Sequence, residues 1–516
     1  FDSPLEGHPT PNSPWVKIAT GSLGQGLSAA LGIAIGKRLD AIPARVYCLM
    51  GDGETAEGSV WEAAEIAGHM KMDNLCAIVD VNALGQSGQT MLGHDVEAYA
   101  RRFESFGWHA GWVDGHDVEA LRKAFATARE LKDKPSVIIA KTDKGHGVKS
   151  VAGKGGWHGK PFKKGPEMEA ALAEVDQAEP LNISVPARAV PAKRPLKPIE
   201  VSIDDPSLTP QYKAGAEVAT REAYGTALAK LGKVSARIVA LDGDTKNSTF
   251  SERFKDAFPE RFVECFIAEQ NMVGMALGLA AEEKIPFCST FAAFLTRAYD
   301  FIRMAVYSRP QHLVLVGSHA GVSIGEDGAS QMALEDLAMI RALMHSTVLY
   351  PCDAVSAERL TALAAHTPGI VYLRMSRPKT AILYGPDEKF PVGGSKVLRQ
   401  SENDRATIVA AGVTVHEALR AHELLLKDGI FTRVIDCYSV KPLDVNALRR
   451  AHRDTKRVFT VEDHSIHGGL GEAVCAAGIP ATILGINEIP RSGTPSELMN
   501  AYGISAEAIV RAVSNW

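Results

Sequence analysis

The sequence predicts an α/β protein made of three consecutive domains, each built on a parallel sheet. Short apolar runs that are typical of buried strands alternate with helical patterns along nearly the whole chain. The chain has 516 residues, which is too many for a single hydrophobic core. Representative strand-like runs span residues 136–142, 237–241, 313–316, 407–411 and 457–461.

Two breaks in composition divide the chain. Residues 180–210 contain seven prolines and mixed charge without a helical period, which is typical of an extended linker. Glycine and proline punctuate a second break at residues 376–404. We therefore expect three domains at 1–180, 211–380 and 392–516, with a proline-rich linker at 181–210.

Composition excludes several classes of function. A net charge of −5 and a hydrophobic content of 46% indicate a globular protein without a nucleic-acid or membrane partner. No uninterrupted apolar run reaches transmembrane length, and no signal peptide is visible. The seven cysteines are scattered and form no Cys-x-x-Cys motif, so we expect free thiols in a reducing, cytoplasmic compartment.

Hard oxygen ligands follow two neighbouring strand-like runs in the first domain. Asp52 lies in the motif Gly51-Asp-Gly-Glu54 after one run, and Asn82 follows the next run. Carboxylate and amide oxygens suit Mg²⁺ or Ca²⁺, and the glycines beside Asp52 leave room for a diphosphate. A tight turn would explain Gly-Asp-Gly alone, but it would not explain Asn82. The pattern therefore predicts a cation and diphosphate site where parallel strands end.

A second group of candidates lies in the second domain. Glu269 ends a strand-like run and precedes a helical pattern over residues 273–281. Taken alone, its carboxylate would be interpreted as a helix cap. Phe291 and Phe294 follow, and aromatic residues at this spacing more often belong to a core than to a cofactor pocket.

Together these motifs closely resemble the transketolase family over essentially the whole chain. Gln331 stands where many microbial relatives carry His, which favours the animal-type branch. The resemblance implies a thiamine diphosphate-binding fold, with two cofactor domains followed by a C-terminal transketolase domain. It is carried by the Gly51 motif and by residues 19–26, 157–160, 242–248, 267–270, 317–327 and 461–464.

The implied activity is the reversible transfer of a two-carbon ketol unit between sugar phosphates in the pentose phosphate pathway. The donor would be a ketose phosphate such as xylulose 5-phosphate, and the acceptor an aldose phosphate such as ribose 5-phosphate. Two alternatives stay open. One is another thiamine enzyme, either a deoxyxylulose-phosphate synthase or a dihydroxyacetone synthase. The other is a truncated, non-catalytic or split-subunit transketolase-like protein.

The resemblance also implies the cofactors, thiamine diphosphate and Mg²⁺, with Ca²⁺ as a possible substitute. Glu269 would hydrogen-bond the pyrimidine ring and favour the tautomer that takes up the proton of the thiazolium carbon. The metal ligands would be Asp52, Asn82 and the carbonyl of Leu84. Asn82 and Glu269 would also contact the cofactor, together with Gly21, Leu23, Gly53, Lys144, His158, Phe291, Phe294 and Gln331.

Substrate roles follow from the same resemblance. Two guanidinium groups suit a phosphate dianion because each can bind it bidentately. Asp327 would bind a hydroxyl beside the reacting carbonyl. His8 and His158 would serve proton transfer or hydrogen-bond hydroxyls, so they join Glu269 as catalytic candidates. The sugar phosphate would be held by Arg221, Ser248, His319 and Arg377, with His158 near its reacting end.

The resemblance further implies a homodimer, in which the first domain of one subunit faces the second domain of its partner across the active site. The third domain carries no obvious chemistry and is expected to pack in this dimer. Family members usually have roughly a hundred more residues before His8, including two further active-site histidines and a serine near the cofactor. The chain is expected to lack that segment.

Overall fold

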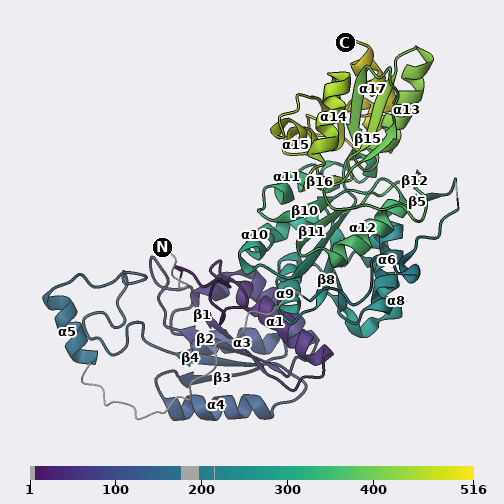
Figure 1. The fold of residues 1–516 in the computed structure, drawn as a ribbon. Coiled ribbons are helices and arrows are strands. Elements are labelled where there is room, and N and C mark those ends of the chain that lie inside the picture. Colours follow the sequence, from purple (N-terminus) through teal and green to yellow (C-terminus); the bar gives the residue numbers. More distant parts are fainter. Residues whose placement is uncertain (1–5, 176–196, 214, 516) are drawn as a thin grey trace. The chain divides into compact units, whose positions relative to one another are not determined.

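The computed structural model describes residues 6–175, 197–213 and 215–515, which belong to two compact units (Figure 1). The first unit comprises residues 1–194 and 277–282, and the second comprises residues 195–276 and 283–516. Residues 181–196 of the predicted linker lie outside the described residues.

The first unit is built on a four-stranded, fully parallel sheet. Gly51 pairs with Asp80, so the first two strands end side by side. The strand-like runs predicted before Asp52 and before Asn82 are confirmed as the first two of these strands. In sheet order the strands are β1 (Val46–Gly51), β2 (Leu75–Val81), β4 (Ser136–Lys141) and β3 (His109–Asp114).

Helices pack on this sheet because their apolar positions recur with the helical period. The helix α4 places Ala128 against Cys76 and Ile138 on one face of the sheet. Its N-terminus is capped by Asp117, whose carboxylate accepts two backbone N–H groups. The helices of this unit are α1 (Gln25–Leu39), α2 (Gly58–His69), α3 (Val96–Ser105), α4 (Val118–Glu130) and α5 (Pro166–Val175), with the short 3-10 helix η1 (Gly53–Ala56) after β1.

The second unit contains a seven-stranded sheet whose central strand, β9, is completely buried. Six strands run parallel, and β16 pairs antiparallel with β10 at one edge. Because β16 comes from the last third of the chain, the C-terminal region completes this sheet. In order the strands are β16 (Ser439–Lys441), β10 (Ser346–Leu349), β11 (Gly369–Arg374), β9 (His312–Ser318), β8 (Ile285–Phe291), β6 (Ile238–Asp242) and β7 (Phe262–Glu264).

A five-stranded sheet forms the C-terminal part of the same unit. It is parallel except for β13, which pairs antiparallel with β15 at its edge. Three α/β sheets are thus confirmed, whereas the two antiparallel edges were not predicted. The strands in order are β13 (Lys396–Arg399), β15 (Thr432–Asp436), β14 (Ala406–Ala410), β17 (Val458–Ser465) and β18 (Thr482–Ile486). A separate two-stranded sheet pairs β5 (Glu217–Ala219) with β12 (Lys379–Ala381).

Helices of the second unit surround its two larger sheets (Figure 1). Those around the seven-stranded sheet are α6 (Thr220–Val234), α7 (Lys246–Thr249), α8 (Glu252–Ala257), α9 (Glu269–Ala281), α10 (Tyr299–Ser308), α11 (Asp336–Arg341) and α12 (Ala354–His366). Of α9, residues 269–276 belong to this unit and the rest to the first unit. Those of the C-terminal part are α13 (Thr414–Lys427), α14 (Val445–Thr455), α15 (Leu470–Ala476), α16 (Pro495–Ala501) and α17 (Ala506–Ser514). In the described residues, no helix combines the length and apolar character needed to cross a membrane.

The described part of the predicted linker packs against the second unit. Ile199 and Leu208 are buried in its core, and Leu208 ends the 3-10 helix η2 (Pro206–Leu208). Arg237 Nη1 donates to the carbonyls of Lys197 and Pro198 at 3.1 and 2.9 Å. From residue 197 onward, this segment is therefore held by both apolar contacts and hydrogen bonds.

Candidate active site

The predicted metal ligands of the first unit lie where β1 and β2 end. Asp52 follows β1 directly and is only 3% exposed. Its carboxylate accepts hydrogen bonds from Gly53 N, Ala83 N and Thr90 Oγ1, each at 2.8 Å. The bond to Ala83 holds the turn after β2 against Asp52, so the structure brings Asp52, Asn82 and Leu84 to one place.

The same turn is supported by polar contacts from the segment after β4. Asn82 Oδ1 accepts the Leu84 N–H at 3.1 Å, and Lys144 Nζ donates to the Leu84 carbonyl at 3.2 Å. Lys144 Nζ also lies 3.1 Å from His158 Nδ1. Lys144 and His158, which were predicted to contact the cofactor, therefore lie beside the predicted metal ligands.

These groups fit a hard divalent cation. Asp52 supplies a buried carboxylate whose three hydrogen-bond donors are all uncharged groups. An amide oxygen and a backbone carbonyl lie on the neighbouring turn, and Mg²⁺ prefers such oxygen ligands. None of these donors carries a positive charge. A bound cation would therefore balance the negative charge of the buried Asp52 carboxylate.

The loop before α1 is tied to the same strand end by a residue that the sequence interpretation did not single out. Glu54 accepts the Gly24 N–H at 2.9 Å and the Gly51 N–H at 3.3 Å. Burial raises the pKa of this carboxyl. The only signal in the sequence was its position at the end of the Gly-Asp-Gly-Glu motif. Glu54 thereby holds the loop that contains Gly21 and Leu23 close to Gly53.

His8 lies against this loop. A Cβ at Gly21 would come within 2.9 Å of the His8 Cβ, so the absence of a side chain at Gly21 makes the approach possible. Leu23, in the same loop, is 54% exposed. The first unit thus gathers its predicted site residues into one region, with His8 beside Gly21 and His158 beside Lys144.

In the second unit, Glu269 begins the helix α9 and is 4% exposed. Its Oε2 lies 3.9 Å from Nε of Arg297, in the 3-10 helix η4 (Phe294–Ala298). Phe294 begins η4, and its ring stacks on Phe291 with centroids 5.1 Å apart. The carboxylate and the aromatic pair, which were predicted to hold the pyrimidine, are therefore linked through one short helix.

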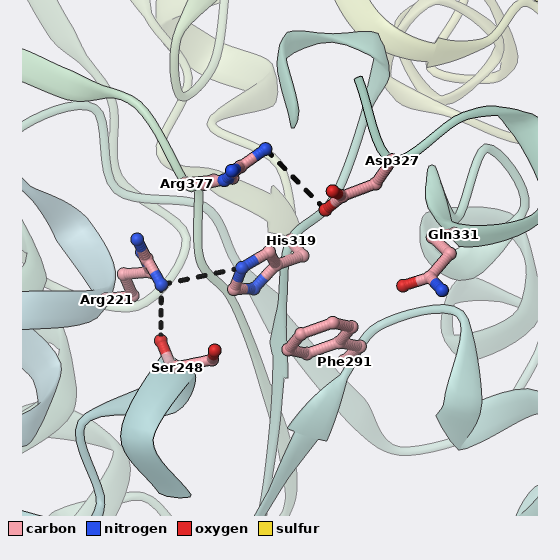
Figure 2. A pocket seen from close by; sticks show the side chains of 7 residues that line it. All are labelled: Arg221, Ser248, Phe291, His319, Asp327, Gln331 and Arg377. Atoms are coloured by element: carbon pink, nitrogen blue, oxygen red, sulfur yellow. Dashed lines mark hydrogen bonds and ion pairs between the residues drawn. The ribbon is translucent and has the colours of Figure 1, made fainter. Parts of the chain in front are cut away.

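A pocket of about 460 Å³ opens in the second unit (Figure 2). Arg221 and Arg377 lie on one side and Gln331 on the other, with His319 and Phe291 between them. The seven lining residues were all predicted to bind substrate or cofactor: Arg221, Ser248, Phe291, His319, Asp327, Gln331 and Arg377.

The two guanidinium groups lie close enough to affect each other. Burial and the nearby Arg377 lower the pKa of Arg221. Nη1 of Arg221 donates to the Ser248 carbonyl at 2.8 Å, whereas its buried Nε lacks a hydrogen-bond partner among the described residues. Two neighbouring cations, one with an unused donor, are suited to an anion such as a phosphate.

His319 is held in its neutral form between these cations and an aromatic ring. Burial, followed by the charges of Arg221 and Arg377, lowers its pKa to about 3. Its ring stacks on Phe291 with centroids 3.9 Å apart, and its Nδ1 lies 2.9 Å from Ser318 Oγ. At neutral pH this imidazole can serve as a hydrogen-bonding group without adding a third positive charge.

Asp242 was missed as a residue that shapes the pocket. It is fully buried and accepts hydrogen bonds from Thr245 N, Thr249 Oγ1 and Ser251 Oγ at 2.6, 2.7 and 2.8 Å. Burial raises its pKa to about 6. These bonds organise the segment around α7, which carries Ser248. The sequence showed Asp242 within a matched motif, but not that it faces inward.

One further cluster of polar side chains could hold a metal ion by its geometry, but contacts within the cluster explain its arrangement. His116, Asp143 and His146 are exposed and place one potential ligand atom each within 4.8 Å of the others. The Asp143 N–H already donates to His116 Nε2 at 2.9 Å, and the two imidazoles stack at 3.6 Å. These mutual contacts account for the cluster.

Comparison with known proteins identifies the class to which this fold and site belong. Residues 1–183 match the family model described as the transketolase thiamine diphosphate binding domain. Residues 216–381 match the pyrimidine binding domain and residues 395–509 the C-terminal domain of the same family. The protein is therefore a member of a class built around thiamine diphosphate.

Individual relatives narrow the assignment. The chain is 52% identical to transketolase of Homo sapiens over 522 residues, which covers 99% of this chain and 82% of the relative. It is 52% identical to transketolase-like protein 2 of Mus musculus, with the same coverage. The crystal structure of transketolase from Campylobacter jejuni shares its fold, with a TM-score of 0.82 at 23% identity, over 100% of this chain and 85% of that one. The chain belongs to the transketolase family.

Proposed function

We propose that this protein is an active transketolase, a thiamine diphosphate-dependent transferase that moves a two-carbon ketol unit from a ketose phosphate to an aldose phosphate. Xylulose 5-phosphate and ribose 5-phosphate are the expected pair, as in the pentose phosphate pathway. The observation that carries the proposal is the pocket in which Arg221 and Arg377 lie beside neutral His319.

Each half of the site has a proposed role. Thiamine diphosphate supplies an electron sink for the carbon that is transferred. Glu269 would hold a proton on the pyrimidine side, while Phe291 and Phe294 pack against that ring and Gln331 lies along it. Asp52, Asn82 and the Leu84 carbonyl would bind Mg²⁺, or Ca²⁺ in its place. Gly21, Leu23, Gly53, Lys144 and His158 would surround the diphosphate.

The substrate would bind with its phosphate toward the two guanidinium groups. Arg221, Ser248, His319 and Arg377 would hold that end, and Asp327 would accept a hydrogen bond from a hydroxyl near the reacting carbon. His8 and His158 would hydrogen-bond hydroxyls or move protons at the other end.

We further propose the assembly and the location. The domains would end near residues 180, 380 and 516, and two copies would form a homodimer that builds each active site from both subunits. All seven cysteines are free, and six of them are buried, which suits a reducing compartment such as the cytoplasm. Matches to transketolases along the whole chain favour ketol transfer between sugar phosphates over the two related synthases.

The test is an assay of ketol transfer from xylulose 5-phosphate to ribose 5-phosphate by the purified chain of verified mass. We expect sedoheptulose 7-phosphate only when thiamine diphosphate and Mg²⁺ are both present, and almost none with Glu269→Gln. Binding of the cofactor without any product would contradict the proposal and favour a non-catalytic or split-subunit protein.

A further inference from the structure

A buried acid of the C-terminal sheet contacts the loop that borders the substrate pocket. Asp463 lies on β17 and is completely buried. Its carboxylate accepts the backbone N–H groups of Val322 and Ser323 at 2.6 and 3.1 Å. These two residues begin the 3-10 helix η5 (Val322–Ile324), which follows β9 and precedes Asp327.

The approach of this carboxylate depends on a glycine. Gly321 has φ of +87°, and a Cβ there would lie 2.1 Å from Asp463 Oδ2. Only glycine tolerates both the left-handed backbone and the contact. Gly325, at the other end of η5, also has a positive φ of +86°. A short helix between two glycines has little rigidity of its own, so its position depends on outside contacts.

The helix in turn holds one of the two pocket arginines. Nη1 of Arg377 donates to the carbonyl of Ile324, the last residue of η5. The same Nη1 lies 3.6 Å from Asp327 Oδ2. Two successive sets of hydrogen bonds therefore connect Asp463 to the guanidinium group that lines the pocket.

A second connection runs through the strand that leads to Arg377. Arg374 ends β11, is fully buried, and donates Nη2 to the backbone carbonyl of Asp463 at 3.0 Å. Its Nε donates to Asp336 at 2.8 Å. Asp463 is thus fixed by its main chain to the segment before Arg377, and by its side chain to the helix that Arg377 contacts.

We propose that Asp463 is a positioning residue for the phosphate end of the substrate pocket. By holding η5, it keeps the Ile324 carbonyl and Asp327 where they orient Arg377, so the guanidinium group is organised before the substrate arrives. This inference rests on the proposed function, because it takes the Arg221 and Arg377 pair as the phosphate site. It gives the C-terminal sheet a part in substrate selection beyond packing in a dimer.

The test compares a ketose phosphate with the same sugar lacking its phosphate, xylulose 5-phosphate against xylulose, in the holoenzyme. Asp463→Asn can accept only one of the two N–H groups and turns an NH₂ toward the other. We expect the ratio of kcat/KM for the two donors to fall by about tenfold, mainly through KM for the phosphorylated sugar. The kcat should stay within about threefold of the original.

The neighbouring residue offers a matched control. Glu462 is equally buried on the same strand and also accepts two backbone N–H groups, those of Leu470 and Gly471, but these begin α15 and not η5. Glu462→Gln should reduce thermal stability while leaving the phosphate preference unchanged. Gly321→Ala disrupts the contact between η5 and the Asp463 carboxylate from the side of η5. It should therefore reproduce the loss of preference for the phosphorylated sugar. This variant replaces Asp463→Asn in the test if Asp463→Asn does not fold.

Each outcome has a distinct meaning. A preference retained within about twofold in Asp463→Asn or Gly321→Ala overturns the positioning role, as does an equal loss in Glu462→Gln. An original enzyme with no preference for the phosphorylated donor instead refutes the proposed phosphate site, and this inference falls with it.

Discussion

The carboxylate of Asp52 accepts the backbone N–H of Ala83 at 2.8 Å and thereby joins the turns that follow two neighbouring parallel strands. Ala83 has a positive φ of 62°, a left-handed conformation that a residue with a Cβ adopts only when its surroundings hold it there. Asn82 and Leu84 flank Ala83 in this turn, and both are partly buried. Asp52 is therefore both a candidate ligand and the group that shapes the other two.

Replacing Asp52 should weaken the binding of metal and cofactor together. Asp52→Asn removes the negative charge and one acceptor, so we expect the affinity for thiamine diphosphate in the presence of Mg²⁺ to fall by at least about tenfold. Isothermal titration with and without Mg²⁺ measures this directly. Asp114→Asn, which changes another strand-end acid of the same sheet, is the control and should bind as the original does. Equal affinity of Asp52→Asn and the original protein would refute the metal role.

Glu269→Gln should strongly reduce turnover while cofactor binding is retained. The amide keeps the shape of the side chain but cannot hold the proton in the same way, so kcat should drop by about 10²–10⁴. Arg297 is a useful comparison because its Nε lies 3.9 Å from Glu269 Oε2, yet its side chain is 65% exposed. Solvent screens the charge of the exposed Arg297, although Glu269 itself is buried, so Arg297→Gln should change kcat by less than about tenfold. Steady-state kinetics at saturating cofactor would decide, and a fully active Glu269→Gln would contradict the assignment.

The arginine pair should determine affinity for the phosphate and not the chemical step. Arg221→Lys and Arg377→Lys keep the charge but lose the planar, bidentate donor, so KM for xylulose 5-phosphate should rise about 10- to 100-fold with little change in kcat. Arg303→Lys changes an exposed arginine that pairs with Asp300 and should leave both constants unaltered. A loss confined to kcat would show that the arginines act on the reaction instead.

The strands and the strand-end residues could be predicted because their signals are local. The run before Asp52 becomes β1 and the run before Asn82 becomes β2, and the motif residues follow them as parallel-strand topology requires. All seven residues around the pocket in the second unit were named from the family resemblance, and three of them, Ser248, His319 and Asp327, lie in motifs that carry it. Recognising this resemblance required no knowledge of how the helices and loops pack against one another.

The supporting residues could not be predicted, because their roles depend on contacts between distant segments. Glu54, Asp242 and Asp463 are acids whose burial and backbone partners appear only in three dimensions. The edge strand β16 is only three residues long, and its partner β10 lies about 90 residues earlier in the chain. A strand of three residues is too short to show the apolar pattern by which a strand is recognised in a sequence.

A buried acid in the second unit makes stability depend on pH in a direction that can be tested. Asp436 ends β15 and is fully buried, with Tyr384 OH donating to its Oδ2 at 2.7 Å and Cys352 Sγ at 3.2 Å. Its other oxygen has no partner among the described residues. Burial raises its pKa from an ordinary 3.8 to about 7, despite both hydrogen bonds.

Because the folded protein binds this proton more tightly than the unfolded chain, Asp436 stabilises the fold most below pH 4. That contribution is lost as the pH rises from about 4 to about 7, and it is constant above. Asp436→Asn cannot ionise, so relative to the original protein it should gain about 1–3 kcal/mol of stability between pH 4.5 and pH 8. Thermal unfolding of both proteins at a series of pH values measures the difference. Asp428→Asn, which changes an exposed acid of the same domain, should show no such gain. A constant offset between Asp436→Asn and the original across this range would mean that Asp436 does not take up a proton on folding.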